Sequence, residues 1–350
     1  MRALPFLCLL VLACGREAAV VVPAAETMDA GDVEGASLTT DAGVDAGVVS
    51  PPPPAPHGAP YPVVFVHGMA GFDAIRIGGL SMDYFGNTVQ DLQARGEQAW
   101  RVVLPPFDSS EARAQELAKQ LTDILRATGS AKVNLIAHSQ GGLDARLLIS
   151  PAGLGWGDRV ATLVTVSTPH RGTKAANVFD RAAGVLPDDV ADALLDGLAG
   201  LLERTAYEVQ NDPHLRAQLH DLTEDAATAF NRKYLDDPRV RYLSWAGRSN
   251  LRAGLEVCDG ATYDNEPLKL DVLLPVFFAV AVATEWGFPP EVSDGLVTVK
   301  SAKWGTFQGC VPADHLDEVG MPNVNGADLS IFDSKQFYRD VVAELRTHGH

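Results

Sequence analysis

Cationic residues, cysteines and long apolar runs are all scarce in this chain of 350 residues. The 28 Lys and Arg residues face 45 Asp and Glu residues, so the formal net charge is −17. This balance argues against a nucleic-acid partner, because a phosphate backbone requires a clustered positive surface. A membrane-spanning helix needs ~20 apolar residues, whereas the longest apolar run, 272–283, has 12 residues and contains Pro275. The 46% of hydrophobic residues is typical of a globular protein and excludes wholesale disorder.

The first 13 residues have the features of a secretory signal peptide. Arg2 precedes an apolar stretch, 4–13, which stops at the small residues Cys14 and Gly15. The stretch 11–14 resembles a bacterial lipobox, in which the signal is cut before a cysteine that then carries lipid. We therefore expect an exported lipoprotein, attached through Cys14 to the outer membrane or cell surface. A plain secretory signal, which would release a secreted protein, is the alternative.

Residues 14–60 are expected to form a disordered linker. They are rich in Ala, Gly, Asp and Pro, and they repeat Asp-Ala-Gly at 41–43 and 45–47. The polyproline stretch 51–54 acts as a semi-rigid spacer. Such a segment suits a folded domain, expected over 61–345, that is held away from a membrane surface.

The four cysteines allow one disulfide in the folded part of the chain. Cys8 and Cys14 lie in the signal, which leaves Cys258 and Cys310 as the only available pair. Export favours a disulfide over two buried thiols, because the compartments outside the cytosol are oxidising. The bond would close a loop of about 50 residues and contribute roughly 4 kcal/mol in the chain-entropy model.

The folded part alternates between apolar, β-branched runs and amphipathic segments. Each apolar run is short and nearly continuous, as expected for strands buried on both faces of a parallel sheet. The βαβα order predicts an α/β fold in which helices cover that sheet. We expect strands at 61–66, 101–104, 133–137, 160–167 and 240–246, and helices at 111–128, capped by Ser109-Ser110, and at 141–149.

A nucleophilic serine is expected at Ser139. The strand 133–137 leads directly into His-Ser-Gln-Gly-Gly and then into a helix, which is the arrangement of a nucleophile elbow with Ala137 in the first small position. The strained turn requires small residues two positions before and after the serine. The following helix offers partial positive charge to a developing oxyanion. A serine in an ordinary turn is the structural alternative.

Two backbone amides are candidates for an oxyanion hole. His67-Gly68-Met69 follows the first strand, and in α/β-hydrolases a loop of this kind donates one backbone N–H. The residue after the nucleophile donates the other. We therefore expect the amides of Met69 and Gln140 to form the oxyanion hole.

The remaining triad members should follow the serine in the order acid, then histidine. Of the nine histidines, three precede Ser139, His170 follows too closely, two fall in a helical, charged region, and the last two lie in a C-terminal tail that is expected to fray. His315 remains, and Asp294 precedes it in an Asp-Gly turn. We expect His315 to accept the serine proton and Asp294 to fix its tautomer. A turn aspartate and a surface or metal-bound histidine are the alternatives.

Taken together, these segments resemble the bacterial true lipases, and most of all the lid-bearing triacylglycerol lipases of the pseudomonad–burkholderia type. The resemblance runs from about 61 to 345 and is loose over 175–235 and 248–290. It implies an α/β-hydrolase fold and an ester hydrolase that acts on acylglycerols at a lipid–water interface through an acyl-enzyme. The resemblance rests on YPVVFVHGMAGFD, KVNLIAHSQGGLDAR, VSTPHRGT, YLSWAG, SDGLV and ADHLDEV.

The same resemblance implies a structural calcium ion near the catalytic histidine. Asp317 matches one of the family's two aspartate ligands, and Asp271 is the nearest match to the other. Oxygen ligands of this kind suit Ca²⁺. Met321 departs from the family pattern, because it replaces a glutamine that would be a better ligand for a hard cation. The position of Cys310, close to His315, departs from the family as well.

A lid is expected around 175–210. Within it, 187–203 predicts an amphipathic helix, with leucines on one side and aspartates on the other. The resemblance implies that such a helix covers the site in water, although a core-facing helix has the same periodicity. An esterase or transacylase on the same scaffold, or a non-catalytic lipid-binding lipoprotein, are the alternative functions. The sequence leaves open the chain-length preference, the oligomeric state and the need for a lipase-specific folding chaperone.

Overall fold

A computed structural model describes residues 57–69, 71, 75–77, 80–82, 84–181, 213–248, 258, 291–320 and 332–350. All of them belong to one unit of the chain, residues 53–350. The expected signal peptide, Cys14 and nearly all of the expected linker lie outside the described residues. Within the described residues, no helix is both long enough and apolar enough to cross a membrane.

The core of the fold is a six-stranded sheet in which every neighbouring pair of strands is parallel. All residues of the three central strands are buried, which explains their continuous apolar character. The expected parallel α/β architecture is therefore confirmed. The strands, in spatial order, are β4 (Ala99–Arg101), β1 (Val63–Val66), β5 (Val133–His138), β6 (Val160–Val166), β7 (Arg241–Gly247) and β8 (Thr306–Val311). A separate antiparallel pair joins β2 (Ile75–Ile77) to β3 (Leu80–Met82).

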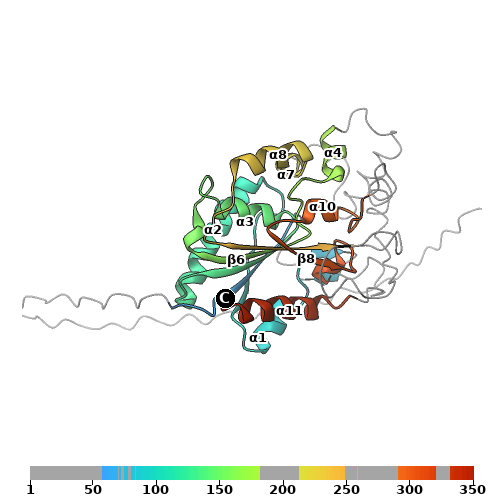
Figure 1. The fold of residues 1–350 in the computed structure, drawn as a ribbon. Coiled ribbons are helices and arrows are strands. Elements are labelled where there is room, and N and C mark those ends of the chain that lie inside the picture. The colour runs from blue at the N-terminus through green and yellow to red at the C-terminus, as the bar shows by residue number, and fades with distance from the viewer. Residues whose placement is uncertain are drawn as a thin grey trace, which may run out of the picture. The chain divides into compact units, whose positions relative to one another are not determined.

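Helices cover both faces of the sheet (Figure 1). On one face, α1 (Thr88–Ala94) and α11 (Ser334–Thr347) pack against an apolar cluster that includes Phe65 and Phe337. On the other, α2 (Ser110–Thr128) and α3 (Gly141–Ile149) enclose a second cluster. The remaining described helices are α4 (Lys174–Arg181), α7 (Pro213–Asp221), α8 (Glu224–Lys233), α10 (Val299–Ala302) and two 3₁₀ turns, Trp156–Asp158 and Asp317–Val319.

The helix after the second strand begins as expected from its cap. The Ser109 hydroxyl accepts a hydrogen bond from the Ala112 amide, which satisfies one free N–H of the first turn of α2. Leu117, Leu121 and Ile124 are buried along one side of this helix. The spacing of the apolar residues therefore predicted correctly which face of α2 is buried.

The second strand and the C-terminal tail differ from expectation. The ladder to β1 runs over 99–101 rather than 101–104, because the backbone leaves the sheet after Arg101 and the Leu104 amide donates to the ring of His67. The tail follows directly on α11, the amides of His348 and His350 donate to the carbonyls of Glu344 and Leu345, and the His350 ring contacts the Thr162 hydroxyl at 3.2 Å. Burial of Phe337, Val341 and Leu345 holds the helix in place.

The described chain enters the fold at His57, next to the end of α2. The His57 amide donates to the carbonyl of Gly129, and the amide of Ala131 donates to the carbonyl of His57. This contact lies just before β5 begins, at the end of the sheet where the parallel strands start.

Candidate active site

The turn between β5 and α3 holds Ser139 in a strained conformation. Its φ angle is 55°, in the left-handed region that residues other than glycine rarely adopt. The Ser139 amide donates to the carbonyl of Val166 on the neighbouring strand, which ties the turn to the sheet. A Cβ atom on Gly141 would lie 2.7 Å from the carbonyl oxygens of Val66 and His67, so this position must be glycine. The sharp turn that the sequence predicts is present.

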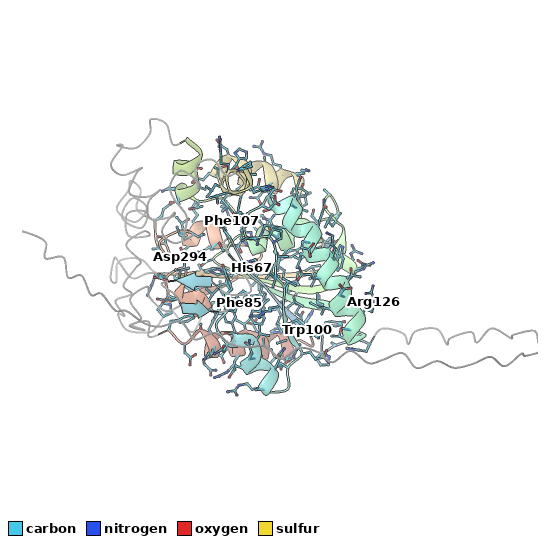
Figure 2. All side chains as sticks on the ribbon, turned by 180° about the vertical axis from the view of Figure 1, so that it is seen from behind. His67, Phe85, Trp100, Phe107, Arg126 and Asp294 are labelled. Atoms are coloured by element: carbon cyan, nitrogen blue, oxygen red, sulfur yellow. A yellow bond between two sulfur atoms is a disulfide. The ribbon has the colours of Figure 1, made fainter. Side chains whose placement is uncertain are left out.

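Three side chains from distant parts of the sequence meet at this turn. The Nε2 atom of His315 lies 3.0 Å from the Ser139 hydroxyl, and its Nδ1 atom lies 2.7 Å from the Asp294 carboxylate. The structure thus brings together the serine, histidine and aspartate singled out in the sequence. Figure 2 shows Asp294 on one side of the described fold and Arg126, in the last turn of α2, on the other.

The second carboxylate oxygen of Asp294 is hydrogen-bonded to two backbone amides. Its Oδ1 atom accepts hydrogen bonds from the amides of Leu296 and Val297, at 2.8 and 2.7 Å. The Asp294 carbonyl also accepts from the His315 amide. Because the carboxylate is fully buried, these donors replace the water that would otherwise solvate it.

The loop after β1 lies directly against Ser139. A Cβ atom on Gly68 would come within 2.6 Å of the Ser139 Cβ atom, so a larger residue would require the loop to shift. Within the described part of the chain, the backbone amides of Met69 and Gln140 have no hydrogen-bond acceptor. No acceptor among the described residues therefore competes for these two amides.

A buried arginine, which the sequence analysis missed, holds this loop. Arg113 of α2 is fully buried, donates to the carbonyls of His67 and Gly68, and pairs with Asp144 of α3 at 2.8 Å. Burial raises the pKa of Asp144 to about 6, while the charge of Arg113 acts in the opposite direction. An arginine on an amphipathic helix gives no sign in the sequence that it points inward.

The ring of His67 supports the same loop from inside. Burial, with a smaller effect of Arg113, lowers the pKa of His67 to about 3, so the ring is neutral at physiological pH. Its Nε2 atom accepts from the Leu104 amide, and its Nδ1 atom therefore carries the proton and donates to the Gly68 carbonyl. His67 is a fixed structural donor rather than a titrating group.

A second buried polar chain, which the sequence analysis also missed, runs beside His315. The Tyr84 hydroxyl lies 2.8 Å from Nδ1 of His138, whose Nε2 atom lies 3.0 Å from the Glu318 carboxylate. Burial lowers the pKa of His138 well below its usual value and, together with Asp294, raises the pKa of Glu318 well above its own. The rings of His138 and His315 lie 4.5 Å apart.

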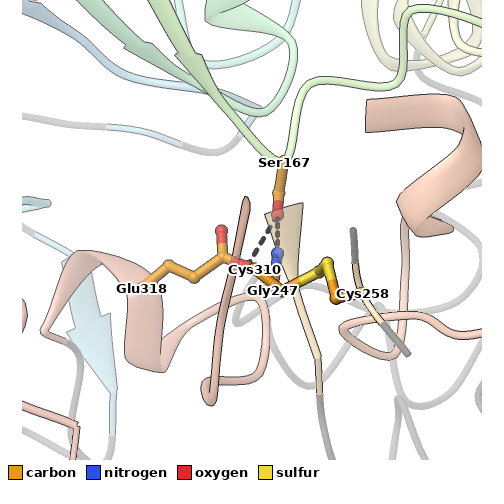
Figure 3. The surroundings of a disulfide bond; sticks show 5 residues. All are labelled: Ser167, Gly247, Cys258, Cys310 and Glu318. Carbon is orange, nitrogen blue, oxygen red and sulfur yellow. Dashed lines mark hydrogen bonds between the residues drawn. A yellow bond between two sulfur atoms is a disulfide. The ribbon is translucent and has the colours of Figure 1, made fainter. Parts of the chain in front are cut away.

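The other oxygen of Glu318 is bound by Ser167. Its hydroxyl donates to Glu318 at 2.7 Å and accepts from the Gly247 amide at 2.9 Å, as Figure 3 shows. Ser167 follows β6 and has a φ angle of 44°. The same view contains the disulfide that joins Cys258 to Cys310, the pairing expected from the cysteine count.

Asp317 is the one expected calcium ligand within the described residues. Asp317 is buried and begins a 3₁₀ turn two residues after His315, while Asp271 and Met321 lie outside the described residues. His138, His315 and Glu318 also place ligand-type atoms within 4.8 Å of one another. The nitrogens of both rings already face protein partners, so this cluster is better described as a hydrogen-bonded network than as a cation site.

Most of the expected lid, including the predicted helix 187–203, lies outside the described residues. Its flanks are α4 and α7. On α7, the Gln218 side chain donates to the side-chain oxygen of Gln140. Gln140 in turn donates to the carbonyl of Asp108 at 3.2 Å. The Gln140 side chain, next to Ser139, is thus held from two directions.

Comparison with known proteins gives consistent matches. A family model described as alpha/beta hydrolase fold matches residues 61–310. A triacylglycerol lipase of Vibrio cholerae serotype O1 is 32% identical over 309 residues, covering 83% of this chain and 88% of the relative. A triacylglycerol lipase of Pseudomonas fragi is 31% identical over 277 residues, covering 74% and 87%.

Solved structures share the fold at lower identity. The mature lipase BlEst2 of Bacillus licheniformis has a TM-score of 0.54 at 19% identity, covering 84% of this chain and 96% of that one. EstA of Clostridium botulinum has a TM-score of 0.56 at 17% identity, covering 84% and 88%. At such identities the likeness concerns the fold alone.

Proposed function

The chain belongs to the bacterial lipases of the α/β-hydrolase family, which are carboxylic ester hydrolases, and we propose that it is an exported triacylglycerol lipase. The reaction proceeds through an acyl-enzyme on Ser139. The single observation that carries this proposal is the placement of His315, which contacts the Ser139 hydroxyl with one ring nitrogen and Asp294 with the other.

The proposed chemistry follows from that placement. His315 Nε2 removes the proton from Ser139 as its oxygen attacks the ester carbonyl. The resulting imidazolium keeps its Nδ1 proton on the bond to Asp294, and it gives the Nε2 proton to the departing alcohol when the C–O bond breaks. Water, activated by the same ring, then attacks the acyl-enzyme and releases the fatty acid and free Ser139.

The oxyanion of each tetrahedral intermediate is assigned to the amides of Met69 and Gln140. What supports this role is that the loop of Met69 packs directly against Ser139 and that α3 starts immediately after Gln140. Donors that are already oriented stabilise the developing charge without further reorganisation, and one such donor typically contributes ~10²–10³ in rate.

The proposal extends to features beyond the described site. The N-terminal sequence supports signal cleavage before Cys14 and lipidation of that cysteine. In a labelling experiment, Cys14→Ser is expected to lose the palmitate label.

Calcium is proposed as a structural ion held by Asp271 and Asp317. For Asp317 the chemistry fits, because a buried carboxylate is a suitable ligand for a hard cation.

The test compares wild type with Ser139→Ala on a short-chain and a long-chain ester, below and above the solubility limit of each. If the protein is a lipase, Ser139→Ala has no activity, and the hydrolysis rate of the wild type rises sharply once an emulsion forms. Wild-type activity on dissolved short esters alone would instead indicate an esterase. Equal turnover by the two proteins, or none from folded wild type supplied with calcium, would refute the proposed triad and favour a lipid-binding lipoprotein.

A further inference from the structure

The loop after β6 is hydrogen-bonded to the segment 294–303, which carries the proposed catalytic acid at its start. The Ser301 hydroxyl accepts from the Arg171 amide at 3.1 Å and donates to the carbonyl of Gly172 at 2.7 Å. The Arg171 guanidinium donates to the Lys300 carbonyl at 2.9 Å. These bonds fix the end of the segment at α10, and the next residue along the loop contacts its beginning.

This next residue, Thr173, binds the turn of Asp294 itself. Its hydroxyl donates to the carbonyl of Leu296. That carbonyl and the Val297 N–H belong to one peptide group, and the N–H donates to Asp294 Oδ1 at 2.7 Å. A trans peptide group is planar, and its C=O and N–H point in opposite directions. Thr173 and Asp294 therefore hold the same peptide group from its two sides, and fixing the carbonyl aims the Val297 N–H at the carboxylate.

The direction of this N–H matters because the Asp294 carboxylate is fully buried and depends on protein donors. Its Oδ2 atom lies 2.7 Å from Nδ1 of His315, while Oδ1 accepts from the amides of Leu296 and Val297. A carboxylate is planar, so the donors that hold Oδ1 also set the direction of Oδ2. Weakening one of them lets the carboxylate rotate out of line with the His315 ring.

Thr173 is itself fixed by backbone groups. Its amide donates to the carbonyl of Leu222 at 2.9 Å, and its carbonyl accepts from the Asn177 amide at 3.3 Å. The hydroxyl oxygen accepts from the Ala175 amide at 3.2 Å. A carbonyl can only accept, so the hydroxyl hydrogen is committed to Leu296.

We propose that Thr173 is a positioning residue whose hydroxyl, through the peptide group 296–297, keeps the Asp294 carboxylate in line with His315. This inference rests on the proposed ester hydrolysis. Thr173 contacts no reacting atom in this scheme, so its removal should lower turnover without weakening the binding of the ester. Its effect should also vanish when Asp294 is absent, because it acts through that carboxylate.

The fold provides a matched control in Thr223. Both threonines are buried, each immediately precedes a helix, and each hydroxyl accepts from a backbone amide at 3.2 Å while it donates to a backbone carbonyl. Thr223 donates to the carbonyl of His220 instead of to the turn of the acid. Thr173→Val and Thr223→Val therefore delete the same atom from similar surroundings, and only the first deletion releases the Leu296 carbonyl.

The kinetic experiment measures kcat and KM on a dissolved short-chain ester, together with thermal unfolding, for wild type and for variants of both threonines. We expect Thr173→Val to lower kcat by about ten-fold at unchanged KM, far less than the ~10⁴ lost with the acid of such a triad. Thr173→Ser, which keeps the hydroxyl, should restore kcat, and Thr223→Val should not lower it. In the Asp294→Ala background, Thr173→Val should lower kcat no further.

A second measurement observes the proposed alignment without any substrate. The proton that His315 Nδ1 donates to Asp294 gives a downfield NMR signal in protein that contains isotopically labelled histidine, and the loss of this signal in Asp294→Ala identifies it. We expect the signal to move upfield in Thr173→Val, because the hydrogen bond to the carboxylate weakens when the two groups lose alignment. It should stay in place in Thr173→Ser and Thr223→Val.

The outcomes separate the proposed function from the proposed role of Thr173. A folded wild type that hydrolyses no ester would refute the function, while the Nδ1 signal still tests the link from Thr173 to Asp294. An active wild type with the same kcat and the same signal in Thr173→Val would overturn the positioning role.

Two further results would contradict the positioning role as well. One is an equal loss of kcat in Thr173→Val and Thr223→Val, and the other is an effect of Thr173→Val that persists in Asp294→Ala. Should Thr173→Val fail to fold, Thr173→Ala takes its place. A loss of kcat as large in Thr173→Ser as in Thr173→Ala would then refute the proposal.

Discussion

The hydroxyls of Ser139 and Ser167 both contact the segment 315–318. The Ser139 hydroxyl lies 3.0 Å from Nε2 of His315, and the Ser167 hydroxyl donates to the Glu318 carboxylate at 2.7 Å. Among the described residues, these two serines are the only ones other than glycine with a positive φ angle. They follow the adjacent strands β5 and β6. Strained backbone of this kind persists only where its surroundings enforce it, and here it points two hydroxyls at one short segment.

Arg113 is predicted to contribute to stability and to turnover through different contacts. Arg113→Met leaves the buried carboxylate of Asp144 unpaired, which should lower the free energy of unfolding by roughly 3–5 kcal/mol. It also releases the carbonyls of His67 and Gly68, so kcat should fall. The double variant Arg113→Met/Asp144→Leu should recover much of the stability in urea unfolding but not the turnover. Recovery of both would argue against a role of Arg113 in holding the loop.

Gly68→Ala is predicted to reduce turnover with little change in fold. The added Cβ atom would lie 2.6 Å from the Ser139 Cβ atom and 2.8 Å from the Tyr84 hydroxyl, so the loop must shift away from the nucleophile. We expect kcat to fall by about 10² or more. Gly58→Ala is the control, because nothing lies within 4 Å of its new atom. Similar kcat values for the two variants would mean that the loop has no part in catalysis.

Reduction of the disulfide is predicted to destabilise the protein. The bond spans 52 positions of the sequence, and closing such a loop contributes about 4 kcal/mol in the chain-entropy model. The double variant Cys258→Ser/Cys310→Ser should unfold at correspondingly lower urea concentration and should not respond to a reductant. A reductant should shift the wild type to the same midpoint. An unshifted wild type would show that the cysteines are not paired in solution.

The contact between α1 and α11 is predicted to depend on pH. Arg339 binds both oxygens of Asp91 at 2.6 Å, and this hydrogen bonding is the main reason that the pKa of Asp91 is lowered to about 2. Since the folded-state pKa is below the unfolded value near 3.8, folding favours the ionised form. The stabilisation is therefore complete above about pH 4 and disappears as the pH falls through about 2.

Unfolding of wild type and Asp91→Asn across this pH range tests the prediction. The pair is partly exposed, so its contribution is expected to be no more than about 1 kcal/mol. The stability difference should shrink as the pH falls from 5 toward 2. Asp123→Asn serves as the control, because its partner Arg126 and Asp123 itself are mostly exposed. A stability difference that grows with acidity would have the wrong sign.

Removal of calcium is predicted to lower the melting temperature. An ion that binds only the folded state stabilises it by about 2.7 kcal/mol at 100 times its dissociation constant. A chelator should therefore destabilise the wild type, and Asp317→Asn should start from a lower melting temperature and respond less. Magnesium at the same concentration should not restore stability. A wild type that is indifferent to the chelator would rule out the proposed ion.

The sequence was most informative where the chemistry depends on neighbouring residues. The elbow around Ser139 and the helix after Ser109 follow from local spacing, and both are present. Tyr84, Arg113 and Glu318 could not be recognised in this way. Their partners lie 54, 31 and 180 positions away, so their roles emerge only when the fold brings distant segments of the chain together. The C-terminal helix was missed because the polar residues near its end concealed the buried face of Phe337 and Leu345.

The entry of the chain at His57 has a practical consequence for presenting the enzyme on a solid support. His57 pairs with Ser130 at the end of the sheet where the parallel strands start, whereas Ser139 follows the opposite end of β5. A bead or electrode coupled at His57 itself would therefore approach the sheet at the end remote from Ser139. Immobilisation from that direction should leave the reactive serine facing the surrounding liquid, ready to meet suspended droplets.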